Sequence, residues 1–123
     1  MKSNRPVNLK LSTLAFPPMA IASILHRISG IVLFVFLPFV LYVLHQSLMS
    51  QKTFLQLQMC SCHVLKTVVW VFGSALIYHV IAGVRHLLSD MNFGDRLPLA
   101  RWTAYGAIGL SVILSLFLGM LLW

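Results

Sequence analysis

Three long stretches of this sequence contain no formally charged residue, and this feature restricts the possible folds more than any other. They are residues 28–51, 67–84 and 102–123. Each is close to the roughly 20 apolar residues that an α-helix needs to cross a bilayer. The chain is 59% hydrophobic and 9% charged, whereas about a quarter of the residues in a soluble domain are charged. The sequence therefore predicts an integral membrane protein.

We predict an all-α integral membrane fold in which the whole chain, residues 1–123, forms a single membrane-anchor domain. Three transmembrane helices are expected, at about residues 23–47, 63–88 and 102–123. Residues 1–18 are expected to form a cytoplasmic arm, since their prolines rule out a continuous helix. The segment between the first two spans, about residues 48–62, could form a short helix at the membrane interface.

Basic residues are concentrated on one side of the predicted membrane. Most of them precede or begin the first span, or lie between the second and the third: Lys2, Arg5, Lys10, Arg27, Arg85, Arg96 and Arg101. The positive-inside rule then places the N-terminus in the cytoplasm and the C-terminus outside. No signal or transit peptide is recognisable. We therefore predict a multi-pass protein of a bacterial inner membrane, and the net charge of +7 does not call for a nucleic-acid partner.

The second predicted span places a histidine inside an apolar run. In a helix, Ala75, His79, Ala82 and His86 lie on one face. An imidazole in hydrocarbon is costly unless its polar nitrogens find partners. Neutral imidazole is a common ligand of metals, including haem iron. His79 is therefore predicted to be an axial ligand of haem iron, and the alternative of a histidine that only hydrogen-bonds a neighbouring helix stays open.

A polar face marks the start of the first span. Ser23, His26, Arg27 and Gly30 lie on one side of a helix there. Such a face can bind a polar head group or the anionic propionate of a haem. The alternative is that Arg27 only extends to lipid phosphates at the interface.

The first two spans run in opposite directions, so Arg85 and His86 are expected at the same cytoplasmic side as Arg27. His79 then lies roughly 9 Å deeper than Arg85, and we expect His26 to be too near the surface to reach that depth. No second histidine is predicted beside His79. The second axial ligand of a shared haem is therefore expected from another polypeptide.

The third predicted span carries small residues at every fourth position. Ala107, Ser111, Ser115 and Gly119 form a face that suits close helix packing in lipid. No formally charged side chain lies in this span, so we predict that it serves as a scaffold.

Three segments together resemble the cytochrome b membrane-anchor subunit of succinate dehydrogenase, in complex II. They are Arg5-Pro-Val-Asn, then Ser23-Ile-Leu-His-Arg-Ile-Ser-Gly30, then His79-Val-Ile-Ala-Gly-Val-Arg-His-Leu-Leu-Ser-Asp90. The resemblance covers nearly the whole chain and includes the three-span layout. Each motif alone is weaker than the combination.

The resemblance implies a role for each matched residue. His79 corresponds to the haem b axial ligand, and a second small anchor subunit supplies the other ligand. Ser23 and Arg27 correspond to residues of the ubiquinone pocket next to the iron–sulfur subunit, and His26 to a histidine close to a haem propionate. Arg85 and His86 match the motif and are expected on the propionate side.

The resemblance also implies a function. Flavoprotein and iron–sulfur partners oxidise succinate, and this subunit passes the electrons to ubiquinone without oxidising succinate itself. Two alternatives from other classes stay open at this point. One is a small helical transporter or proton-conducting protein, and the other is a structural anchor without a cofactor.

Overall fold

The computed structural model describes residues 17–59, 63–91 and 97–123. The described part of the chain forms four α-helices and no strand: α1 (Pro18–Met49), α2 (Gln51–Met59), α3 (His63–Asp90) and α4 (Leu97–Leu122). Three of them, Pro18–Met49, His63–Asp90 and Pro98–Leu122, are long and apolar enough to span a membrane. The predicted all-α membrane fold with three spans is confirmed, and the predicted interfacial segment does form the short helix α2. Most of the predicted cytoplasmic arm, residues 1–16, lies outside the described residues.

Two helices extend beyond the predicted spans. α1 starts at Pro18 and α4 at Leu97, each about five residues before the start of the predicted span. A proline in the first helical turn lacks only an N–H that would have no partner inside the helix. Pro18 and Pro98 are therefore tolerated in these first turns. The charge-free stretches delimit the apolar span, whereas the helix continues beyond it.

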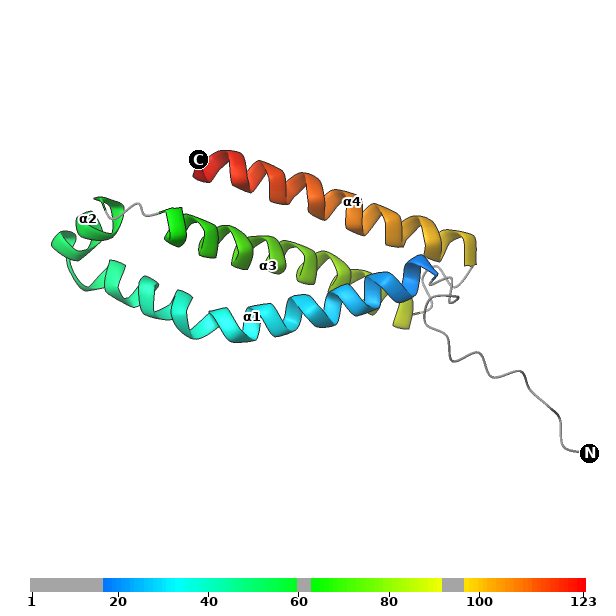
Figure 1. The fold of residues 1–123 in the computed structure, drawn as a ribbon. Helices are drawn as coiled ribbons and strands as arrows, with labels where there is room; N and C mark the ends of the chain where they lie inside the picture. Colours follow the sequence, from blue (N-terminus) through cyan, green and yellow to red (C-terminus); the bar gives the residue numbers. More distant parts are fainter. Residues whose placement is uncertain (1–16, 60–62, 92–96) are drawn as a thin grey trace, which may run out of the picture.

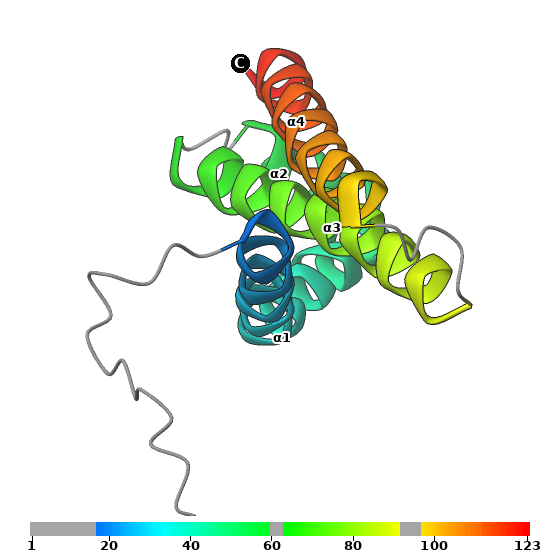
Figure 2. The ribbon, with the colours of Figure 1, turned by 90° about the vertical axis from the view of Figure 1, so that its right-hand side faces the viewer.

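The three long helices lie side by side, with α3 between α1 and α4 (Figures 1 and 2). α1 and α3 run in opposite directions, so the start of α1 lies at the same end as the end of α3 and the start of α4 (Figure 1). α2 and the C-terminal Trp123 lie at the other end. α1 continues through Pro38. This arrangement brings the polar start of α1 beside the histidine-bearing half of α3.

The helices meet through small residues. Among the described residues, the buried positions are four alanines and two serines: Ala22, Ala82, Ala104, Ala107, Ser29 and Ser111. Large apolar side chains such as Phe34 and Met120 point outward and are 80% and 79% exposed. Lipid tails are as apolar as leucine, so small residues that allow close backbone approach hold membrane helices together. The exposed apolar surface is the surface expected of a chain surrounded by lipid.

α3 and α4 are joined by hydrogen bonds on the predicted small-residue face. The indole Nε1 of Trp70 donates to the carbonyl oxygen of Ser115 at 2.9 Å, and the hydroxyls of Ser74 and Ser115 are 2.6 Å apart. Gly119 lies against the indole, where an added Cβ would be 3.1 Å from Nε1. The predicted packing face of the third span is therefore confirmed.

Candidate functional site

His79 lies in the interface between α1 and α3, and its ring is held from α1. Its Nδ1 is 3.0 Å from the hydroxyl oxygen of Ser29 and 3.3 Å from the carbonyl oxygen of His26. The Ser29 hydroxyl in turn donates to the same His26 carbonyl at 2.8 Å. Ser29 is 6% exposed, so this small network lies away from the surface. The neighbouring helix therefore determines the orientation of the imidazole.

These contacts favour one tautomer of His79. A carbonyl oxygen only accepts hydrogen bonds, so the His26 carbonyl favours an N–H at Nδ1. The Ser29 hydroxyl, which donates to the same carbonyl, then accepts from that N–H. In the neutral ring, Nε2 then carries the lone pair. A histidine in this state has a nitrogen available for a metal.

The ring of His26 stacks on the ring of His79. The two ring centroids are 4.1 Å apart and the planes differ by 12°. The expectation that His26 lies too near the surface to reach the depth of His79 was wrong. The position of His79 along α3 does not show how deep His26 of α1 lies. The register between α1 and α3 brings His26 opposite His79. Ser29 is one turn further along α1 and contacts the same ring.

His26 also carries an unsatisfied polar atom. Its Nε2 is buried and has no hydrogen-bond partner among the described residues. Gly83 of α3 lies close by, since a Cβ added there would be 3.5 Å from that nitrogen. The ring of His86 lies 5.2 Å from that of His26, tilted by 54°. Buried polar nitrogens nearly always have partners, so this atom is a candidate contact for a ligand or for another chain.

Glycine keeps the space beside His79 open. A Cβ built on Gly30 would be 3.2 Å from Cε1 and 3.7 Å from Nδ1 of His79. The first of these distances is tighter than ordinary van der Waals contact, so even alanine would press on the ring. Gly30 and Ser29 thus position the imidazole from two sides.

Three of the predicted site residues lie elsewhere around this cluster. Ser23 is half-buried and Arg27 is exposed, both in the first turns of α1. Arg85 is directed at α4, where its guanidinium donates to Thr103 Oγ1 at 3.3 Å and to the Ala100 carbonyl at 3.1 Å. The structure therefore brings His26, His79 and His86 together, but it separates Arg85 from them.

Two residues of this region were not predicted from the sequence. Ser29 is the hydrogen-bond partner of His79, and Tyr78 donates its hydroxyl to the Ala22 carbonyl at 2.9 Å. Ser29 lies inside the motif that carries the resemblance, three residues after His26, so helical spacing was a usable signal. No local pattern indicates that Tyr78 reaches across to α1.

Comparison with known proteins gives a consistent result. The profile of the family described as Succinate dehydrogenase/Fumarate reductase transmembrane subunit matches residues 1–118. A succinate dehydrogenase cytochrome b556 subunit of Coxiella burnetii is 42% identical over 125 residues and covers 100% of both chains. A protein of the same name from Rickettsia prowazekii is 31% identical, over 82% of this chain and 76% of its own length. Another from Paracoccus denitrificans is 30% identical, over 93% of this chain and 88% of its own.

Proposed function

This chain belongs to the succinate dehydrogenase/fumarate reductase transmembrane subunit family, and from that membership we propose that it is the haem b- and quinone-binding membrane anchor of a succinate dehydrogenase. It is a multi-pass protein of a bacterial inner membrane. The whole chain acts as one anchor domain, with its N-terminus in the cytoplasm. Flavoprotein and iron–sulfur partners oxidise succinate, and electrons leave through this subunit to ubiquinone.

The pair of oxygens that face Nδ1 of His79 is the single observation that carries the haem proposal. Its Nδ1–H is held by the Ser29 hydroxyl and the His26 carbonyl, so Nε2 has the lone pair that an axial ligand of haem iron needs. Metal-bound histidines usually donate their other nitrogen in this way, which orients the ring and makes it more basic. These residues fit a haem, which supplies one-electron chemistry when bound.

A haem held by His79 would take its second ligand from a partner. His26 would not provide it, because its ring lies face to face with that of His79. A second small membrane-anchor subunit supplies the ligand. The subunit described here is therefore half of a shared haem site.

His26 and His86 hold the propionate side of the haem. The buried Nε2 of His26 lacks a partner, and a propionate oxygen would accept a hydrogen bond from it. His86 lies beside the same ring. Arg85 was expected to join them, but its hydrogen bonds to α4 favour a different role.

Ser23 and Arg27 bind ubiquinone. They lie one helical turn apart at the start of α1, in the end of the bundle predicted to face the cytoplasm. The Arg27 guanidinium orients the quinone and stabilises the oxygen that gains negative charge on reduction, as positioned cations do. Ser23 donates or accepts a hydrogen bond at the quinone oxygen.

A reduced-minus-oxidised optical spectrum of the complex purified in mild detergent tests the haem site. We expect a b-type haem signal in the wild type that is lost in His79→Ala and kept in His45→Ala, an exposed histidine at the far end of α1. A haem signal unchanged in His79→Ala would refute the ligand assignment. An intact complex without haem would instead favour the cofactor-free anchor.

Quinone reduction tests the second assignment. Ser23→Ala and Arg27→Leu should assemble, keep the haem spectrum and reduce a soluble artificial acceptor with succinate, while ubiquinone reduction falls. Arg101→Gln removes another exposed arginine at the same end of the bundle and serves as the control. Normal quinone turnover in both variants would rule out this pocket.

A further inference from the structure

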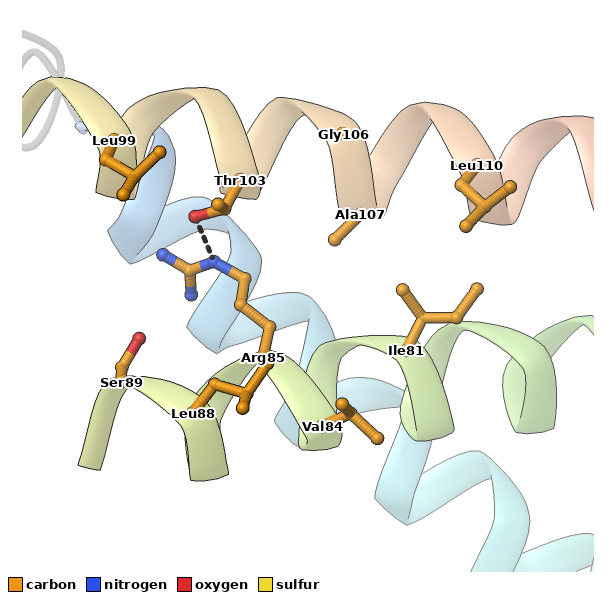
Figure 3. A pocket seen from close by; sticks show the side chains of 10 residues that line it. All are labelled: Ile81, Val84, Arg85, Leu88, Ser89, Leu99, Thr103, Gly106, Ala107 and Leu110. Carbon is orange, nitrogen blue, oxygen red and sulfur yellow. Dashed lines mark hydrogen bonds between the residues drawn. The ribbon is translucent and has the colours of Figure 1, made fainter. Parts of the chain in front are cut away.

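A cavity lies between α3 and α4. None of the residues that line it belongs to the cluster of His26, His79 and His86. Its volume is about 470 Å³, within the range of pockets that hold small ligands. Figure 3 shows Arg85 extending from α3 into the space between the helices, toward Thr103 of α4. The same view shows Ile81 and Leu110 facing each other at the other end.

The polar side chains of this cavity lie at one of its two ends. Its three polar lining side chains, Arg85, Ser89 and Thr103, gather at one end (Figure 3). The other lining residues are apolar or glycine: Ile81, Val84, Leu88, Leu99, Gly106, Ala107 and Leu110. A cavity with one charged end and apolar walls matches an elongated amphiphile with a single polar head.

The arginine is not neutralised by its described contacts. Its Nε donates to Thr103 Oγ1 and one terminal nitrogen to the Ala100 carbonyl, and both acceptors are uncharged. A guanidinium has five N–H donors, so further donors remain for an anion. Phosphate oxygens pair with this group through strong, charge-assisted hydrogen bonds.

The depth of the cavity fits one leaflet of the membrane. Arg85 lies about 7.5 Å along the helix from Asp90, the last residue of α3, which is a short distance from the end predicted to be cytoplasmic. The α4 wall from Leu99 to Leu110 is about 16 Å long, close to half of the roughly 30 Å hydrocarbon core. Val84 and Leu88 are half exposed, so the cavity opens at the surface of this chain.

We propose that this cavity binds an anionic membrane phospholipid. Its phosphate contacts Arg85, Ser89 and Thr103, and one acyl chain lies between α3 and α4 along Ala107 and Leu110. Anionic headgroups of the cytoplasmic leaflet attract basic groups at this depth. Free phosphate would leave the apolar walls uncovered, and a neutral amphiphile would leave Arg85 without an anion among the described residues. This site does not depend on the haem or quinone assignments.

Lipid binding to the whole complex tests the proposal. The complex is stripped of lipid in detergent and titrated with dioleoylphosphatidylglycerol, and bound lipid is counted by native mass spectrometry. We expect one tightly bound molecule in the wild type and weaker binding of dioleoylphosphatidylcholine. Arg85→Gln should weaken the phosphatidylglycerol site by about tenfold or more, because hydrogen bonds to charged groups are lost.

A second pair of variants tests the cavity without changing any charge. Gly106 lines the cavity, and an added Cβ meets nothing within 4 Å, so the side chain in Gly106→Leu should fill the space and displace the lipid. Gly109 is equally unobstructed on α4 but does not line the cavity, so Gly109→Leu should bind lipid normally. The haem spectrum of both glycine variants reports that the complex has assembled.

Three results would overturn the proposal. One is phosphatidylglycerol binding that is unchanged in both Arg85→Gln and Gly106→Leu. Another is displacement of the lipid by decylubiquinone at this site, which would make it a quinone site. The third is loss of haem with normal lipid binding in Arg85→Gln, which would return Arg85 to the propionate side.

Discussion

Replacing Ser29 with alanine should change the electronic properties of the haem ligand without removing it. The substitution deletes the hydroxyl that accepts the Nδ1–H of His79 at 3.0 Å. The remaining acceptor is the His26 carbonyl, at the longer distance of 3.3 Å. The ring should therefore stay in place on a weaker hydrogen bond, and Nε2 should become a less basic ligand.

The strength of that bond sets an upper limit on the change in the midpoint potential of the haem. Hydrogen bonds between membrane helices average about 0.6 kcal/mol, and an ordinary intramolecular bond contributes up to about 1.5 kcal/mol. For a one-electron couple, about 59 mV corresponds to tenfold, or about 1.4 kcal/mol. Only the part of this energy that differs between oxidised and reduced haem changes the midpoint potential, so the potential should rise by no more than about 65 mV. The potential rises because the less basic ligand in Ser29→Ala stabilises oxidised iron less than the wild-type ligand does.

Spectroelectrochemical titration of the purified complex measures this shift. Ser111→Ala is the matched control, since Ser111 is a buried serine that also donates to a carbonyl of its own helix, but it lies on α4. Its haem potential should equal that of the wild type. An unchanged potential in Ser29→Ala, or an equal shift in both variants, would refute the reasoning from the Ser29–His79 hydrogen bond.

Other substitutions test the packing that supports the site. Gly30→Ala places a Cβ 3.2 Å from His79 Cε1, so the ring must move and the haem absorption band should shift; an unaltered band would contradict the tight contact. Gly119→Ala presses on Trp70 Nε1 at 3.1 Å and should lower stability by about 1–3 kcal/mol, measured by thermal unfolding in detergent, whereas Gly109→Ala should have little effect. Trp70→Phe removes an interhelical hydrogen bond and should cost about 0.6 kcal/mol; a thermal midpoint equal to that of the wild type would argue against that bond.

The fold was predictable because each span forms largely on its own. Backbone groups in lipid must be satisfied within the helix, so a local stretch without charge is enough to indicate a span. The described spans agree with the three charge-free stretches. α1 and α4 begin before the predicted spans, at Pro18 and Leu97, because the end of the apolar stretch is not the end of the hydrogen-bonded helix.

The candidate site was predictable in its residue types and only partly in its geometry. His79 was identified because an imidazole in an apolar run needs a partner. The stacking of His26 on His79 and the hydrogen bond from Ser29 were not foreseen. Both depend on the register between α1 and α3, which brings together residues that are 50 or more positions apart in the chain.

Sequence alone determined how many helices cross the membrane, which side chains are costly to bury, and which family the motifs resemble. The tertiary structure decided which tautomer of His79 is favoured, that His26 reaches the same depth, and that Arg85 faces α4. The reason is physical. Hydropathy is a sum over residues that are neighbours in the sequence. The rotation and register of membrane helices follow instead from the close packing of small residues such as Ala22 and Ala82. Hydropathy does not report that packing.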